Sequence, residues 1–171
     1  MAQQVAITAD PFGTGEAFDQ WDGFPEDRAR MLGEIESSGL RDVVFITGDA
    51  HVFMCSLLGT DFPAVGSDPK RVPAAVEYIG GSVTSPGLIR SETEARNDAP
   101  WIQEYNGADK GYAIFGADGE KLVTEYRSSD LSNPAGATHG LDRFTQPAGV
   151  NRVAREVLAP PVQRRQQRIP T

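Results

Sequence analysis

Residues 43–47, Val-Val-Phe-Ile-Thr, limit most strongly what this chain can fold into. An unbroken run of apolar and β-branched residues is typical of a strand that is covered on both faces. A helical pattern precedes this run. Pro25 suits a first helical turn, and Glu26 and Asp27 favour its positive N-terminal end. Gly39 is a natural stop for that helix. A helix followed by a buried strand favours an α/β sheet.

Further segments add strands to this picture. Residues 74–79 read as another buried strand, whereas residues 52–58 are compatible with a strand or a helix. Later in the chain, residues 111–115 and 121–126 flank Ala-Asp-Gly-Glu at positions 117–120. An Asp-Gly turn between two apolar runs predicts a β-hairpin.

The 171 residues fit a single domain with a real core. We expect residues 1–16 to be a poorly patterned lead-in, residues 17–145 to form the domain and residues 146–171 to be a flexible tail rich in Arg, Pro and Gln. The arginines of this tail are expected to be solvated rather than to form an anion-binding arm. They are Arg152, Arg155, Arg164, Arg165 and Arg168.

Composition excludes several classes of function. The net charge of -8 would repel a nucleic acid, although a bound cation could still attract a small phosphorylated substrate. No apolar run is long enough for a membrane span, and residues 1–10 lack the pattern of a signal peptide. If the parent protein is exported, the address is expected elsewhere. Cys55 is the single cysteine, so a disulfide within the chain and a Cys-rich zinc site are both excluded.

The residues with the clearest chemistry are Gly48-Asp49-Ala50-His51, directly after the predicted strand. Open α/β sheets bind ligands beyond the carboxyl ends of their strands. Asp49 offers hard oxygen atoms and His51 an imidazole nitrogen. Two residues apart in an extended segment, both side chains could reach one cation or two adjacent ones. The alternative is an ordinary turn, in which Asp49 caps backbone amides and His51 is a half-buried histidine.

Four segments, in order, resemble the C-terminal part of the PhoD-type alkaline phosphatases of the calcineurin-like metallophosphoesterase superfamily. The likeness spans roughly residues 17–145. It is carried by Asp-Gln-Trp-Asp-Gly-Phe-Pro at 19–25, the strand and Gly-Asp-Ala-His at 42–51, Glu-Tyr-Ile-Gly-Gly-Ser-Val-Thr-Ser-Pro-Gly at 77–87, and the hairpin that begins at Gly111-Tyr112 and continues through 122–127.

This resemblance implies the C-terminal portion of a metallophosphoesterase-type α/β sandwich with a terminal β-hairpin. It implies that Asp49 and His51 bind the active-site metals, of an iron-and-calcium type, and that the activity is hydrolysis of phosphate monoesters or diesters. By the same analogy Trp21 and Asp22 would line the substrate pocket, the alternative being a helix-entry loop. Members of the family are commonly exported, which gives an expectation of a periplasmic or external location.

The chain also departs from the family pattern. The superfamily takes its first metal ligands from motifs in the N-terminal half, and nothing in residues 1–40 resembles them. Asp49 and His51 alone are too few for a closed metal site. Two classes of function therefore remain. One is a metal-dependent phosphoesterase, of which this chain is a truncated sequence, one product of a split gene, or a fragment that needs a complementary N-terminal chain. The other is a non-catalytic remnant or interaction module that keeps part of the fold.

Overall fold

The computed structural model describes residues 1–10, 19–88, 90–130, 133 and 137–159. Within these residues no helix is long and apolar enough to cross a membrane. In chain order the elements are β1 (Ala2–Gln3), the 3₁₀ helix η1 (Trp21–Gly23), α1 (Pro25–Ser38), β2 (Val44–Thr47), β3 (Phe53–Leu58), α2 (Phe62–Ser67), β4 (Ala75–Gly80), α3 (Glu92–Asp98), β5 (Ile102–Asn106), β6 (Gly111–Ala117), β7 (Lys121–Ser128), β8 (His139–Pro147) and β9 (Ala154–Val157).

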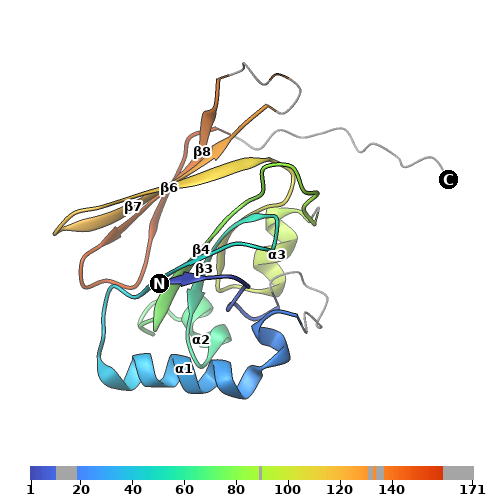
Figure 1. Cartoon of the computed structure of the whole chain (residues 1–171). Helices are drawn as coiled ribbons and strands as arrows, with labels where there is room; N and C mark the ends of the chain where they lie inside the picture. Colours follow the sequence, from blue (N-terminus) through green and yellow to red (C-terminus); the bar gives the residue numbers. More distant parts are fainter. Residues whose placement is uncertain (11–18, 89, 131–132, 134–136, 160–171) are drawn as a thin grey trace.

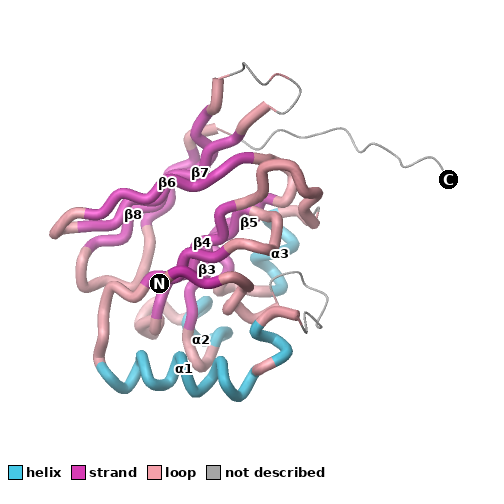
Figure 2. Tube along the Cα trace, viewed as in Figure 1, coloured by secondary structure: helices cyan, strands magenta, loops and turns pink. Residues whose placement is uncertain are grey.

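Two sheets form the molecule. The first has the strand order β1-β2-β4-β3-β5, and the second is an antiparallel sheet in the order β6-β7-β8-β9. In the first sheet β1, β2 and β4 run parallel, while β3 is antiparallel to both of its neighbours. The second sheet lies over one face of the first, and α1 and α2 lie on the opposite side (Figures 1 and 2). The expected α/β sandwich portion is confirmed.

Aromatic side chains fill the space between the two sheets. The ring of Phe53 from the first sheet lies 5.1 Å from that of Tyr126, and Tyr78 lies 5.7 Å from Phe144. The hydroxyl of Tyr126 donates a hydrogen bond of 2.5 Å to the Met54 carbonyl in β3. All of these side chains are buried. The two sheets are therefore joined by apolar packing and by at least one buried hydrogen bond.

The local patterns of the sequence correspond closely to several elements. Pro25 opens α1, and Gly39 ends it with a φ of 70°, a left-handed conformation that glycine adopts without strain. Residues 52–58, which the sequence left open, form the fully buried strand β3. The predicted hairpin is β6 and β7, whose turn is closed by the Asp118 carboxylate accepting from the amides of Glu120 and Lys121.

The expectation that β2 is covered on both faces is wrong on one face. Phe45 and Thr47 are buried, but Ile46, which points the other way, is 39% exposed. The second sheet packs on β3 and β4, through pairs such as Phe53 with Tyr126 and Tyr78 with Phe144, whereas Ile46 lines a pocket opposite the turn of the β6–β7 hairpin. An apolar run therefore indicated a strand correctly but overstated its burial.

The domain is longer at both ends than the sequence indicated. Residues 2–3 form β1 and residues 6–8 are buried, so the start of the expected lead-in belongs to the folded part. Residues 11–16 of that lead-in lie outside the described residues. At the other end β9 extends the second sheet past residue 145. Arg152 is not simply solvated, because its guanidinium donates to the carbonyls of Asp68 and Arg71 just after α2. Residues 160–171, with the last three arginines of the expected tail, lie outside the described residues.

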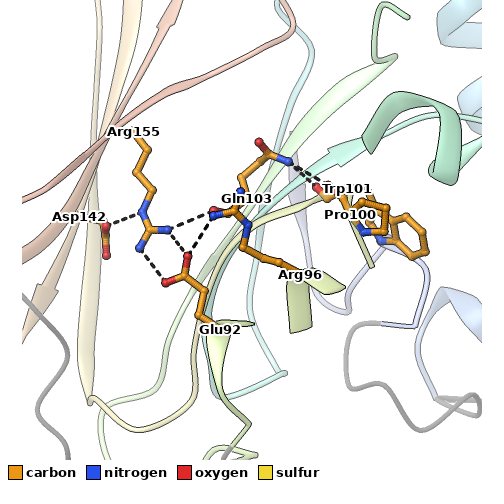
Figure 3. A network of polar contacts seen from close by, with 7 residues as sticks. All are labelled: Glu92, Arg96, Pro100, Trp101, Gln103, Asp142 and Arg155. Carbon is orange, nitrogen blue, oxygen red and sulfur yellow. Dashed lines mark hydrogen bonds and ion pairs between the residues drawn. The ribbon is translucent and has the colours of Figure 1, made fainter. Parts of the chain in front are cut away.

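Arg155 of β9 also belongs to the folded part, where it is the centre of a polar network (Figure 3). Its Nε donates to Asp142 Oδ1 at 2.6 Å, and its two terminal nitrogens pair with both oxygens of Glu92. The same guanidinium donates to the Gln103 carbonyl at 3.2 Å. Glu104, the next residue of β5, is 1% exposed, and burial raises the pKa of its carboxyl well above the ordinary value. One arginine thus links β9 to β8, α3 and β5.

Candidate metal centre

The candidate centre lies where the three parallel strands of the first sheet end. Parallel strands place their carboxyl ends at one edge of a sheet, so the loops after β1, β2 and β4 meet there. The loop after β2 contains Asp49 and His51. The structure brings this loop into contact with Gln20, which follows β1, and with Pro86, which follows β4. Both predicted metal ligands therefore lie at the edge where the parallel strands end, which is where open α/β sheets usually bind ligands.

The backbone around Asp49 is tightly turned rather than extended. Asp49 and His51 have positive φ angles of 61° and 59°, and the Ala50 amide donates to the Gly48 carbonyl at 2.7 Å. The expectation of an extended segment is thus wrong. The reason lies in the strand order, because the chain must leave β2, pass the end of β4 and reverse direction into β3 within a few residues. Left-handed residues other than glycine cost about 1–2 kcal/mol each, and such strain is concentrated at functional sites.

One oxygen of the Asp49 carboxylate is held by Gln20. The Nε2 atom of Gln20 donates to Asp49 Oδ2 at 2.7 Å, while Gln20 Oε1 accepts from the Ala6 amide at 2.6 Å. Asp49 itself is exposed, and its Oδ1 accepts no hydrogen bond from the part of the chain that the structure describes. That oxygen is free to bind a ligand.

The ring of His51 is held by a contact of its Nδ1 atom. Its Nδ1 lies 3.2 Å from the carbonyl oxygen of Pro86. A carbonyl oxygen can only accept, so Nδ1 must carry a proton, and in the neutral ring Nε2 then keeps its lone pair. Metal-binding histidines are oriented by hydrogen bonds of this kind. Gly87 permits the approach, because a Cβ atom there would lie 2.5 Å from the His51 carbonyl oxygen.

These two side chains fit part of a metal centre. A carboxylate oxygen and a neutral imidazole nitrogen suit iron and other first-row metals. Among the described residues, neither Asp49 Oδ1 nor His51 Nε2 has a hydrogen-bond partner. Structural and catalytic metal sites usually take at least three protein ligands. Within residues 1–10, 19–88, 90–130, 133 and 137–159, no third His, Cys, Asp or Glu completes such a group. The described residues can therefore contribute two ligands to a centre but do not complete one.

Trp21 and Asp22, predicted to line a substrate pocket, are placed differently from each other. Trp21 lines a largely apolar groove of about 750 Å³, together with residues that include Gln20 and Phe24. Asp22 instead pairs with Arg28 of α1 at 2.5 Å. Only Trp21 is thus placed on an open groove, whereas Asp22 stabilises the entry into α1. Substrate binding by either residue stays a prediction.

The family to which the chain is similar agrees with this geometry. The family model for PhoD-like phosphatases matches residues 1–126, which include both Asp49 and His51. This chain belongs to the PhoD-like phosphatase family. The family match ends within β7, so β8 and β9 lie beyond it.

Two individual proteins support the membership of this PhoD-like chain. Alkaline phosphatase D of Bacillus subtilis (strain 168) is 32% identical over 145 residues, which cover 80% of this chain and 24% of that protein. A solved structure described as the structure of PhoD superposes with a TM-score of 0.78 at 25% identity, covering 95% of this chain and 32% of the other. The PhoD-like chain therefore spans between a quarter and a third of the length of these relatives.

A buried carboxylate links two of the segments that form the candidate centre. Glu77 of β4 is fully buried and accepts hydrogen bonds from the amides of Ile7 and Thr8 and, at 2.7 Å, from the Thr47 hydroxyl. Burial raises the pKa of Glu77, and these hydrogen bonds act in the opposite direction. Since Thr47 lies two residues before Asp49, Glu77 ties the loop after β1 to the end of β2.

Sequence reasoning assigned no role to Gln20, Glu77 or Pro86. All three lie within the segments that carry the family resemblance of this PhoD-like chain, and that position is the one signal that could have pointed to them. Their partners are distant in the chain. Gln20 is separated from Asp49 by 29 positions, and Pro86 from His51 by 35.

Proposed function

We propose that this chain supplies one side of a metal centre that hydrolyses phosphate esters, with Asp49 Oδ1 and His51 Nε2 as metal ligands. The observation that carries the proposal is the pairing of the two side chains with uncharged partners. Each has one polar atom bonded to Gln20 or Pro86 and the other free, at the edge where three parallel strands end. Membership in the PhoD-like phosphatase family supports phosphate esters as the substrate class.

Metal binding also resolves a charge problem. The chain has a net charge of -8, and the carboxylate of Asp49 adds negative charge where a phosphoryl group would bind. A cation bound there would reverse the local sign, polarise a phosphoryl oxygen and provide a water molecule of lowered pKa. By resemblance to the alkaline phosphatases we propose iron and calcium as the metals. Asp49 would contribute charge and His51 a neutral nitrogen.

The remaining ligands must come from residues outside the described ones. The chain spans 32% of the solved PhoD structure that it matches, so most of that fold is not covered by this sequence. We propose that the uncovered part of the family fold, on the same or on a complementary polypeptide, supplies those ligands. The competing possibility is a non-catalytic module, which would keep the loop geometry but would not hydrolyse phosphate esters.

Metal titration of the chain tests the assignment of Asp49 and His51 as ligands. Millimolar Mn²⁺, followed by nuclear magnetic resonance, is expected to broaden signals of residues 48–52 and 86–87 selectively. Asp49→Ala and His51→Ala should abolish the selective broadening. His139→Ala is the matched control, because His139 is the other histidine of the chain and lies exposed at the start of β8. Equal broadening in all three variants would overturn the ligand assignment.

Activity requires the rest of the fold. The chain is combined with a polypeptide covering the remaining part of a PhoD-like phosphatase, and hydrolysis of p-nitrophenyl phosphate and bis-p-nitrophenyl phosphate is measured. We expect His51→Ala to lower kcat/KM at least about 100-fold, because loss of a metal ligand removes the charge that stabilises the transition state. His139→Ala should leave it unchanged. Selective metal binding without hydrolysis by the assembled pair would favour the non-catalytic module.

A further inference from the structure

Gln20 is an amide side chain buried next to the candidate metal ligand. It is 2% exposed, although its side chain carries both a donor and an acceptor. Both are used: Oε1 accepts from the Ala6 amide at 2.6 Å, and Nε2 donates to Asp49 Oδ2 at 2.7 Å. We propose that Gln20 is a positioning residue that fixes the Asp49 carboxylate for metal binding. This inference rests on the proposed role of Asp49 as a ligand.

The direction of the amide is determined by its partners. The backbone amide of Ala6 can only donate, so it must face the oxygen of the Gln20 side chain. The nitrogen then necessarily faces Asp49, where it meets an acceptor. Reversing the amide would place two donors opposite each other at Ala6 and two acceptors opposite each other at Asp49. Gln20 therefore selects one orientation of the Asp49 carboxylate, with Oδ2 occupied and Oδ1 open.

The backbone segments that carry Gln20 are joined by several hydrogen bonds. The Trp21 amide donates to the Ala6 carbonyl at 3.1 Å, so residues 20–21 and Ala6 are joined by a pair of hydrogen bonds. The next residues, Ile7 and Thr8, are anchored by the buried carboxylate of Glu77. A side chain that is anchored in this way can hold Asp49 in one rotamer, as the supporting residues of a binding site must.

The neutrality of Gln20 matters as much as its position. A lysine or arginine here would hold Asp49 equally well but would neutralise its charge and repel a cation. An amide donates a hydrogen bond and leaves the full negative charge of the carboxylate available to the metal. His51 is oriented in the same way, by the uncharged Pro86 carbonyl. Residues of this kind next to metal ligands typically contribute 10- to 100-fold to metal affinity.

The test replaces the amide without changing the length of the side chain. Gln20→Met removes both the donor to Asp49 and the acceptor for the Ala6 amide, and we expect the apparent Kd for Mn²⁺ to rise about 10- to 100-fold. Gln103→Met is the matched control, since Gln103 donates to the Pro100 and Trp101 carbonyls instead. The control should keep the wild-type Kd. An unchanged Kd in Gln20→Met, with binding still abolished by His51→Ala, would overturn this inference and leave the proposed function intact.

A second readout needs no metal. Three-bond couplings from the backbone to the Asp49 carboxyl carbon report its χ1 angle. We expect a single rotamer in the wild type and averaging in Gln20→Met. If that variant unfolds, Gln20→Glu replaces it for this readout, because it keeps an acceptor for the Ala6 amide and puts, in place of the donor, a carboxylate oxygen that repels Asp49. A fixed Asp49 rotamer in the folded variants would refute the positioning role. If the Asp49 rotamer averages in the variants but the wild type does not bind Mn²⁺, the metal site is refuted and the positioning of Asp49 by Gln20 is not.

Discussion

Nδ1 of His51 lies 3.2 Å from the carbonyl oxygen of Pro86, across the ends of two neighbouring parallel strands. This contact brings together residues that are 35 positions apart. It fixes the ring and determines which nitrogen carries the proton, because the partner can only accept. In the neutral form of such a histidine, Nε2 keeps its lone pair.

The first prediction concerns this proton. In the neutral form, His51 should be protonated at Nδ1, and long-range ¹H–¹⁵N spectra of the ring identify the protonated nitrogen directly. His139 provides the comparison within the same spectrum, since it is exposed and should exchange between both forms. A His51 ring protonated mainly at Nε2 would contradict the Pro86 contact and remove the free nitrogen from the proposed site.

The second prediction concerns the hydrogen bond between the sheets. Tyr126→Phe removes the hydroxyl that donates to the Met54 carbonyl but keeps the ring packed against Phe53 and Phe144. The free energy of unfolding, measured by urea denaturation, should fall by about 1 kcal/mol. Tyr112→Phe, at an exposed ring whose hydroxyl lies 3.4 Å from Thr138, should change it by less than about 0.5 kcal/mol. Equal effects of the two substitutions would argue against this buried bond.

The third prediction concerns the network around Arg155. Arg155→Ala leaves the buried carboxylate of Asp142 without its cation and should lower the free energy of unfolding by about 3 kcal/mol. Arg143→Ala is the control on the neighbouring strand. Its side chain is 41% exposed and pairs with Glu125 and Glu156, so we expect a loss below about 1 kcal/mol. A small effect of Arg155→Ala would mean that β9 contributes little to stability.

The fourth prediction concerns the pH dependence of stability. Burial, with a smaller contribution from Asp142, raises the pKa of Glu104 well above its ordinary value of 4.5. At pH values between that value and the raised pKa, the folded chain holds a proton that the unfolded chain has released. This proton makes the free energy of unfolding fall as pH rises, by up to about 1.4 kcal/mol per pH unit.

Glu104→Gln removes this titration. Relative to wild type, the variant should gain stability as the pH is raised from 5 to 8, which urea denaturation at several pH values would measure. Glu120→Gln, in the exposed turn of the β6–β7 hairpin, changes the same charge at the surface and should show no such trend. Parallel pH profiles for wild type and Glu104→Gln would show that Glu104 is ionised in the folded chain.

Local patterns predicted the elements of the fold. The helix from Pro25 to its stop at Gly39, the strand before Asp49 and the hairpin around Asp118 all follow from residue periodicity, capping and turn chemistry. These signals act over a few residues, so the elements can be predicted without knowledge of the rest of the chain. The resemblance of several segments in order then indicated the PhoD-like family, which the comparisons confirmed.

Only the tertiary structure decided how distant groups meet. The order β1-β2-β4-β3-β5 places the ends of three parallel strands together, and this order is not written in any local pattern. It brings Gln20 to Asp49 and Pro86 to His51. It also forces the tight turn at Asp49, where the sequence indicated an extended segment. The sequence by itself pointed to the two side chains that we propose as metal ligands. The strand order determined which atoms of those side chains are held and which are left free.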